Sequence, residues 1–187
     1  MNRREAIAAV GWILGGTIIG ADLLVSCTSK AAKVNKLFDQ DQVTFLDEVG
    51  ETILPATNTP GAKAAKIGNF MATMVQDCYT KEDQKVFLQG IKQLNEESQK
   101  KFDKDFLEAT PQERTTLLKQ LDAEQKKYMA TKKLEEPNHY FRMMKELTLL
   151  GFFTSEVGAT QALRYVETPG RFDGCMPYKK GDRAWAT

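Results

Sequence analysis

The chain has 187 residues, of which 42% are hydrophobic and 27% are charged, and its formal net charge is +1. These values fit one ordinary globular domain. A nearly balanced charge gives no electrostatic basis for binding nucleic acid, so we expect no partner of that class.

The first 26 residues have the pattern of an export signal. Arg3 and Arg4 precede a run from Ala6 to Val25 that is apolar or small apart from Thr17 and Asp22, which is typical of a signal peptide. A paired arginine at this place is also the address of the twin-arginine route. We expect twin-arginine export, with general secretion as the alternative because the residues after the arginine pair are not the aromatic residue and leucine of that pattern.

The apolar run ends at Cys27, in the segment Leu-Val-Ser-Cys, which resembles a bacterial lipoprotein box. In such a box the cysteine is acylated and becomes the first mature residue, and two or three acyl chains hold a protein firmly on a membrane. An uncleaved transmembrane anchor and plain cleavage are the alternatives; several glycines and Asp22 weaken the first. We therefore expect an exported lipoprotein, anchored in the cell envelope or periplasm, with a polar tether over residues 27–36.

Helical periodicity then predicts an all-α domain over residues 37–165, with no sustained alternation of the kind that marks a strand. A first helix, which Pro55 stops, is predicted to bury Val43, Leu46, Val49 and Ile53. A second has the clearest apolar stripe, made of Ile67, Phe70, Met71, Met74, Val75 and Cys78.

Two further helices have recognisable start signals. Thr80 with Asp83 resembles a capping box, and the helix that follows is predicted to bury Phe87, Ile91, Leu94 and Phe102. The segment Thr110-Pro-Gln-Glu113 is a stronger start, because its hydroxyl can cap, its proline suits the first helical position and its glutamate can reach back. The face of this helix is predicted to consist of Leu117, Leu118, Leu121 and Tyr128.

Pro137 is predicted to open another helix, with Tyr140, Met144, Leu147 and Gly151 on one side and Phe141 and Leu150 beside them. The segment Gly151-Phe152-Phe153-Thr154-Ser155-Glu156 is predicted to form an architectural turn and not an active site. Glycine would end one helix, the two phenylalanines would plug the junction, and Ser155 or Thr154 would cap a short helix through Leu163. The glycines and prolines of residues 166–187 predict an irregular tail.

The chemistry-bearing residues do not form a recognisable catalytic constellation. His139, the sole histidine, is expected to be an exposed or locally bonded ring at a helix start. The cysteines are too far apart for a metal site, and no nucleotide or flavin motif occurs. We therefore predict no catalytic residue, cofactor or metal in this chain. Cys78 is expected to be a buried, inert thiol, and Cys175 an exposed one that can pair in an oxidising compartment.

The C-terminal half resembles the gluconate 2-dehydrogenase subunit 3 family. The resemblance is carried by Gly151-Phe-Phe-Thr-Ser-Glu156, by Leu163 and Tyr165, and by Pro169-Gly-Arg-Phe-Asp-Gly-Cys175. The turn Ile53-Leu-Pro55, followed by Thr59-Pro-Gly-Ala62, is similar to the N-terminal half of the family. Together these matches span about residues 40–175.

This resemblance implies a small helical subunit of a membrane-associated dehydrogenase that oxidises gluconate, another sugar or an alcohol. FAD and the substrate would then belong to a larger subunit, which would travel on this chain's signal, and a cytochrome c subunit would often take the electrons. A lipid anchor on this chain departs from that pattern and puts the cytochrome's role in membrane attachment in doubt.

The tail contains residue types that are enriched at interfaces. They are Arg171, Phe172, Cys175, Tyr178, Arg183 and Trp185. We expect them to dock on the large subunit; the alternative is that the tail wraps its own domain.

Three functions remain open. The preferred one is a non-catalytic subunit that escorts, stabilises and anchors a flavoprotein. A free-standing envelope lipoprotein with a binding or structural role is the first alternative, and an independent enzyme is the second.

Overall fold

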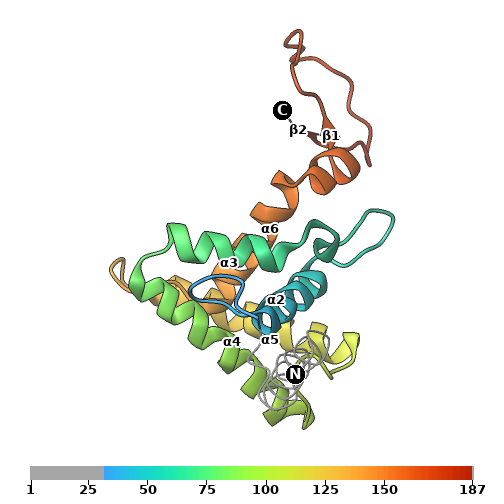
Figure 1. Ribbon diagram of the computed structural model, residues 1–187. Coiled ribbons are helices and arrows are strands. Elements are labelled where there is room, and N and C mark those ends of the chain that lie inside the picture. The colour runs from blue at the N-terminus through green and yellow to red at the C-terminus, as the bar shows by residue number, and fades with distance from the viewer. Residues whose placement is uncertain (1–31, 187) are drawn as a thin grey trace, which may run out of the picture. The chain divides into compact units, whose positions relative to one another are not determined.

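The computed structural model describes residues 32–186, and this part of the chain is all-α as predicted (Figure 1). The helices are α2 (Gln40–Ile53), α3 (Ile67–Cys78), α4 (Lys81–Phe102), α5 (Pro111–Thr131) and α6 (Tyr140–Thr154). A 3₁₀ turn η1 (Ala62–Ala65) precedes α3, and a π-helical turn η2 (Gly158–Ala162) follows α6. Two short strands, β1 (Arg164–Tyr165) and β2 (Trp185–Ala186), pair in parallel.

The segment before α2 is held against α3. The Asn35 amide donates to the Ala72 carbonyl at 3.0 Å, and the Lys36 N–H donates to Gln76 Oε1 at 2.8 Å. Phe38 is buried, and its ring meets that of Phe87 on α4 edge to face at 6.1 Å. Residues 33–36 therefore belong to the folded domain and not to the predicted tether.

Helix α2 begins with a capping box and ends where the sequence predicts. Asp39 Oδ1 accepts from the Gln42 N–H at 2.8 Å, and Gln42 Oε1 accepts from the Asp39 N–H at 3.1 Å. Leu54 is the C-cap, immediately before Pro55. Val43, Leu46 and Val49 are buried, as predicted, and Ile53 is partly buried.

Both predicted start signals of the next helices are confirmed. Thr80 Oγ1 accepts from the Asp83 N–H at 3.2 Å, and Thr110 forms a complete capping box with Glu113. Gln84, buried in the first turn of α4, places its Nε2 within 3.2 Å of three carbonyl oxygens at the end of α3. Since the last carbonyls of a helix have no partner inside it, this one amide joins the end of α3 to the start of α4.

The predicted buried face of α5 is shorter than the sequence suggested. Leu117, Leu118 and Leu121 are buried, but Tyr128 is 36% exposed. Its hydroxyl donates to the Pro137 carbonyl at 3.0 Å and its ring lies 5.7 Å from that of His139. Tyr128 therefore braces the loop after α5 and does not enter the core.

Helix α6 packs against α2, α3, α4 and α5, so it is the central element of the domain. It begins at Tyr140, with His139 as N-cap, and not at Pro137 as predicted. Its buried side includes Tyr140, Phe141, Met143, Met144, Leu147 and Phe152. Leu150, predicted to lie beside this face, is 49% exposed.

Asp122 ties α5 to α6 by an ion pair. Its carboxylate accepts from Lys145 on α6 at 2.5 Å and from Lys126 at 2.8 Å. A hydrogen bond from Lys126, followed in size by one from Lys145, lowers the pKa of Asp122 to about 2. The folded state therefore holds this carboxylate ionised at pH values where the unfolded chain protonates it.

We expect Asp122→Asn to lower the free energy of unfolding by about 1 kcal/mol at neutral pH, a modest value because solvent screens a partly exposed pair. Because the folded pKa is depressed, the contribution is present above the unfolded pKa of about 3.9 and is lost as pH falls toward 2. Urea unfolding at several pH values measures the difference, with Glu135→Gln on an exposed loop as control. A difference that persists unchanged at pH 2 would contradict the assignment.

Candidate functional site

Exposed apolar side chains gather at the C-terminal end of the chain. Within residues 32–186, eight of the twelve large hydrophobic side chains that are exposed lie at or beyond Leu149. We call these eight the C-terminal apolar surface: Leu149, Leu150, Phe153, Tyr165, Phe172, Met176, Tyr178 and Trp185. Several large apolar side chains exposed in one part of a chain are typical of a protein or membrane interaction site.

The end of α6 contributes the first part of this surface. Phe152 is buried at 4% exposure, whereas its neighbour Phe153 is 40% exposed, and the two rings meet edge to face at 5.3 Å. The prediction that both rings plug a junction is therefore wrong for Phe153. Successive residues on a helix point in different directions, and at this end of α6 only Phe152 belongs to the core.

Gly151 does not end α6, contrary to the prediction, because the helix continues to Thr154. A Cβ atom at this position would lie 2.5 Å from Cδ1 of Phe70 on α3. The absence of a side chain at Gly151 therefore lets α3 and α6 approach closely. The glycine has no special backbone conformation.

Ser155 joins α6 to the next turn. Its hydroxyl donates to the Phe152 carbonyl at 2.7 Å and accepts from the Gly158 N–H at 3.0 Å. The Leu163 N–H then donates to the Gly158 carbonyl at 2.9 Å, the five-residue spacing of a π turn. This turn directs the chain away from α6 and into β1.

The tail is a loop closed by β1 and β2 (Figure 1). The N–H groups of Arg164 and Val166 donate to the carbonyls of Ala184 and Ala186 at 2.8 and 2.9 Å. The Arg164 guanidinium lies over the Trp185 ring at 4.5 Å, a favourable cation–π arrangement. The tail therefore has a fixed base, which its irregular composition did not reveal.

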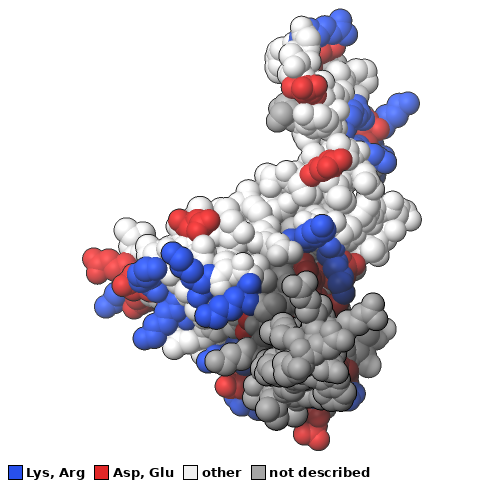
Figure 2. Space-filling model, viewed as in Figure 1, with Lys and Arg blue, Asp and Glu red and all other residues white. Residues whose placement is uncertain are grey.

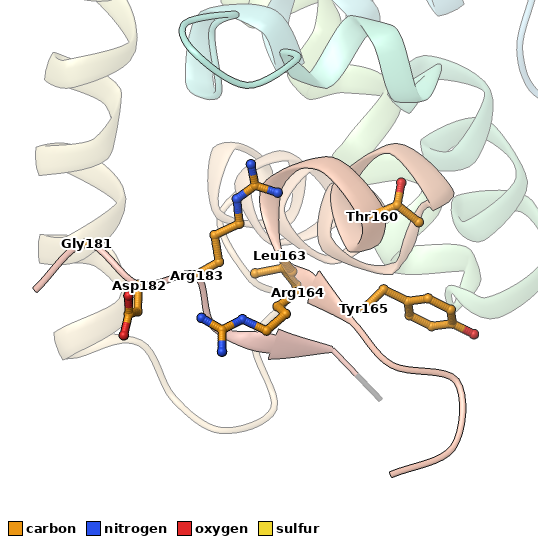
Figure 3. A pocket seen from close by; sticks show the side chains of 7 residues that line it. All are labelled: Thr160, Leu163, Arg164, Tyr165, Gly181, Asp182 and Arg183. Carbon is orange, nitrogen blue, oxygen red and sulfur yellow. The ribbon is translucent and has the colours of Figure 1, made fainter. Parts of the chain in front are cut away.

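A hollow of about 610 Å³ lies beside this base. Figure 3 shows that Thr160 of η2 and Leu163, directly after η2, line it together with Arg164 and Tyr165 of β1 and with Gly181, Asp182 and Arg183 from the segment before β2. Of the predicted interface residues, Arg183 thus lines the hollow and Trp185 stacks on one of its walls. The predictions missed Arg164, whose side chain lines the hollow and also lies over the Trp185 ring.

The rest of the predicted interface lies in the loop between the strands. Phe172 is 96% exposed and Tyr178 is 76% exposed, and Arg171 lies 3.9 Å from the Asp173 carboxylate. Cys175, also exposed, donates its N–H to Asp173 Oδ1 at 3.2 Å. These side chains are accessible to a partner.

The prediction for Cys78 is wrong, since this residue is exposed. It is the last residue of α3, where the helix ends and its stripe has no neighbour to cover it. Cys78 and Cys175 form no disulfide within residues 32–186.

His139 has a structural position. Its Nδ1 accepts from the Phe141 N–H at 3.2 Å, and its ring stacks on Tyr140 at 4.6 Å. Burial lowers the pKa of His139. The side chain thus caps α6, the locally bonded arrangement that was expected.

Three further observations concern the described residues only. No group of three or more His, Cys, Asp or Glu side chains that could hold a metal ion occurs there. No helix in residues 32–186 is long and apolar enough to span a membrane. The predicted export residues Arg3 and Arg4 and the predicted lipidation site Cys27 lie outside this part of the chain.

Comparison with known proteins identifies one family. The sequence model described as Gluconate 2-dehydrogenase subunit 3 matches residues 40–170, which include all five α-helices described above, η2 and β1. Neither a curated protein nor a solved structure gives a significant match to the chain.

Proposed function

Because the chain belongs to the gluconate 2-dehydrogenase subunit 3 family, we propose that it is a non-catalytic small subunit that escorts, stabilises and anchors an FAD-dependent dehydrogenase. The large subunit would carry FAD and oxidise gluconate, another sugar or an alcohol. A cytochrome c subunit is a further candidate partner. The complex would lie in the cell envelope.

The observation that carries this proposal is the C-terminal apolar surface. Its aromatic side chains are exposed in the isolated chain although each would gain about 1.5–3 kcal/mol on full burial. Phe172 and Tyr178 sit on a loop, where they can enter pockets, and Trp185 is preorganised by Arg164. Aromatic residues and arginine are the side chains that most often dominate binding energy at interfaces.

The C-terminal apolar surface has two parts, because its side chains stand on two different segments of the chain. Leu149, Leu150 and Phe153 stand on the rigid end of α6, whereas Phe172, Met176 and Tyr178 stand on the loop between β1 and β2. We propose that the large subunit covers both parts. The helix end would set the orientation, and the loop would order on binding.

Escort and anchoring rest on the N-terminal pattern. Arg3 and Arg4 would direct the folded complex to the twin-arginine route, and acylated Cys27 would hold it on the membrane. Escort also requires the large subunit to be docked on the C-terminal apolar surface, whereas the export signal and the acylated cysteine lie before the helical domain.

The proposal is tested by following the large subunit in cells. Replacing Arg3 and Arg4 by lysine should leave both proteins in the cytoplasm, whereas Arg142→Lys on α6, which lies outside the proposed surfaces, should not affect export. Cys27→Ala should release the exported complex from membranes, because the acyl chains provide most of the anchoring free energy. If the large subunit reaches the envelope without this chain, the escort role is wrong and a free-standing lipoprotein is favoured.

A further inference from the structure

A second surface, formed by α4 and the segment before α2, is basic. A hollow of about 270 Å³ is lined by Lys81, Lys85 and Lys92, with Leu37, Gln84, Leu88 and Gln89 between them. No carboxylate lines it. Figure 2 shows Lys and Arg side chains gathered over α4, close to the segment that leads into α2.

Helical spacing explains this arrangement. Residues 81, 85, 88 and 92 follow one another at spacings of four, three and four positions, so their side chains share one face of α4. The nearby acidic residues Glu82 and Asp83 line a different hollow, together with Leu134 of the loop after α5. The face therefore presents three ammonium groups around Leu37 and Leu88.

These lysines have no anionic partner within residues 32–186. None of them forms an ion pair there, and the only side-chain bond among them is from Lys81 to Gln84 Oε1 at 3.2 Å. Lys92 also lines a second hollow, which contains Asp41, Asp105 and Glu108, but it forms an ion pair with none of them. Ammonium groups that lack an ion pair favour binding of an anionic surface.

The sequence places this face close to the predicted anchor. Residues 28–32 separate Cys27 from Lys33, so an extended chain keeps Lys33 within about 20 Å of an acylated cysteine. From Lys33 the backbone runs directly to Leu37, which lines the hollow, and Lys36 is held on α3 through Gln76. Lys33 and Lys36 are both exposed and add to the positive charge of this segment.

We propose that Lys81, Lys85 and Lys92 bind the anionic headgroups of the bilayer that holds the acyl chains. The inference rests on the proposed lipid anchor and adds an orientation to it. Phosphate groups would meet the three lysines, and Leu37 and Leu88 would lie toward the glycerol esters. Each lysine near an anionic surface raises the bound population about fivefold, so three lysines favour this orientation about a hundredfold.

An acidic patch on the large subunit is the rival occupant. The headgroups are favoured because the segment that follows the predicted anchor contributes Leu37 to this face. The C-terminal apolar surface belongs to other elements, α6, β1, β2 and the loop between the strands. The two surfaces share no residue, so they can be occupied together.

The experiment is lysine footprinting on the full, processed chain. The protein is mixed with excess vesicles of phosphatidylcholine, or of phosphatidylcholine with phosphatidylglycerol, and treated with a water-soluble acetylating reagent. Mass spectrometry then reports each lysine. Reactivity at Lys81, Lys85 and Lys92 should fall at least about fivefold on the anionic vesicles only, and 1 M salt should restore it because screening is then strong beyond about 3 Å.

Substitutions provide a matched comparison. Exposed Lys36, in the segment that leads to Leu37, should also be protected on anionic vesicles. Replacing the three lysines by glutamine should abolish this protection. The same replacement at exposed Lys119, Lys127 and Lys133, on and after α5, should preserve it.

Equal reactivity on the two kinds of vesicle would overturn the inference, as would protection of these lysines by the large subunit alone. The mass of the Cys27 peptide tests the anchor separately. The headgroup contact is judged on chains whose Cys27 peptide carries the acyl chains, so failure of the anchor and failure of the contact are distinguished.

Discussion

Truncation after Tyr165 is expected to leave a folded helical domain that no longer retains the large subunit. Residues 167–185 are all exposed, and none of them belongs to the hydrophobic core. The strand β2 pairs only with β1, and the remaining hydrogen bonds of the tail are local. Removing the tail should therefore change the free energy of unfolding by about 0.5 kcal/mol or less.

The loss of binding should be large, because truncation removes four of the eight side chains of the C-terminal apolar surface. Melting temperature and retention of the large subunit on an immobilised chain measure the two effects. Phe172→Ala with Tyr178→Ala should reproduce most of the loss, while Lys179→Gln with Lys180→Gln, in the same loop, should not. A truncated chain that retains the large subunit at wild-type affinity would show that the tail is not the docking element.

The second large effect is expected at the two adjacent phenylalanines. Phe152→Ala should lower the free energy of unfolding by about 3–5 kcal/mol, the usual cost of removing a buried aromatic ring. Phe153→Ala should cost about 1 kcal/mol or less, because its ring is 40% exposed. Urea unfolding of the two variants gives the comparison.

Binding should show the opposite order. The Phe153→Ala chain remains folded but lacks a side chain of the C-terminal apolar surface, so it should bind the large subunit at least about tenfold more weakly, the equivalent of about 1.4 kcal/mol. Equal stability of the two variants would contradict the assignment of Phe152 to the core. Undiminished binding by Phe153→Ala would remove the end of α6 from the interface.

Helices and their caps are the features that the sequence predicted well. A cap depends on residues three positions apart, and Thr80 with Asp83 and Thr110 with Glu113 satisfy that local rule. The buried stripe of Ile67, Met71 and Val75 follows equally from helical spacing.

Features that depend on contacts between elements distant in sequence could not be predicted from local spacing. Cys78 continues the stripe of α3 but lies at its last turn, where nothing covers it. Gly151 looked like a helix end because the ring of Phe70, which approaches it, is distant in sequence.

The candidate site was predicted only in part. Phe172, Tyr178 and Trp185 were identified from composition, and all three are exposed. Two-residue strands are too short to show alternation, so the pairing of Arg164 with Trp185 was missed. Leu149 was also missed, although apolar residues on more than one side of α6 indicate a second covering surface.

The most direct test of the account is to purify this chain, with an affinity tag after Thr187, from native membranes and to identify what accompanies it. We expect a flavoprotein dehydrogenase to accompany it, with the flavin absorbance and the sugar-acid, sugar or alcohol oxidation activity in that complex, and the isolated chain to be colourless and inactive. A chain recovered from membranes without any flavoprotein, or one that oxidises these substrates by itself, would contradict it.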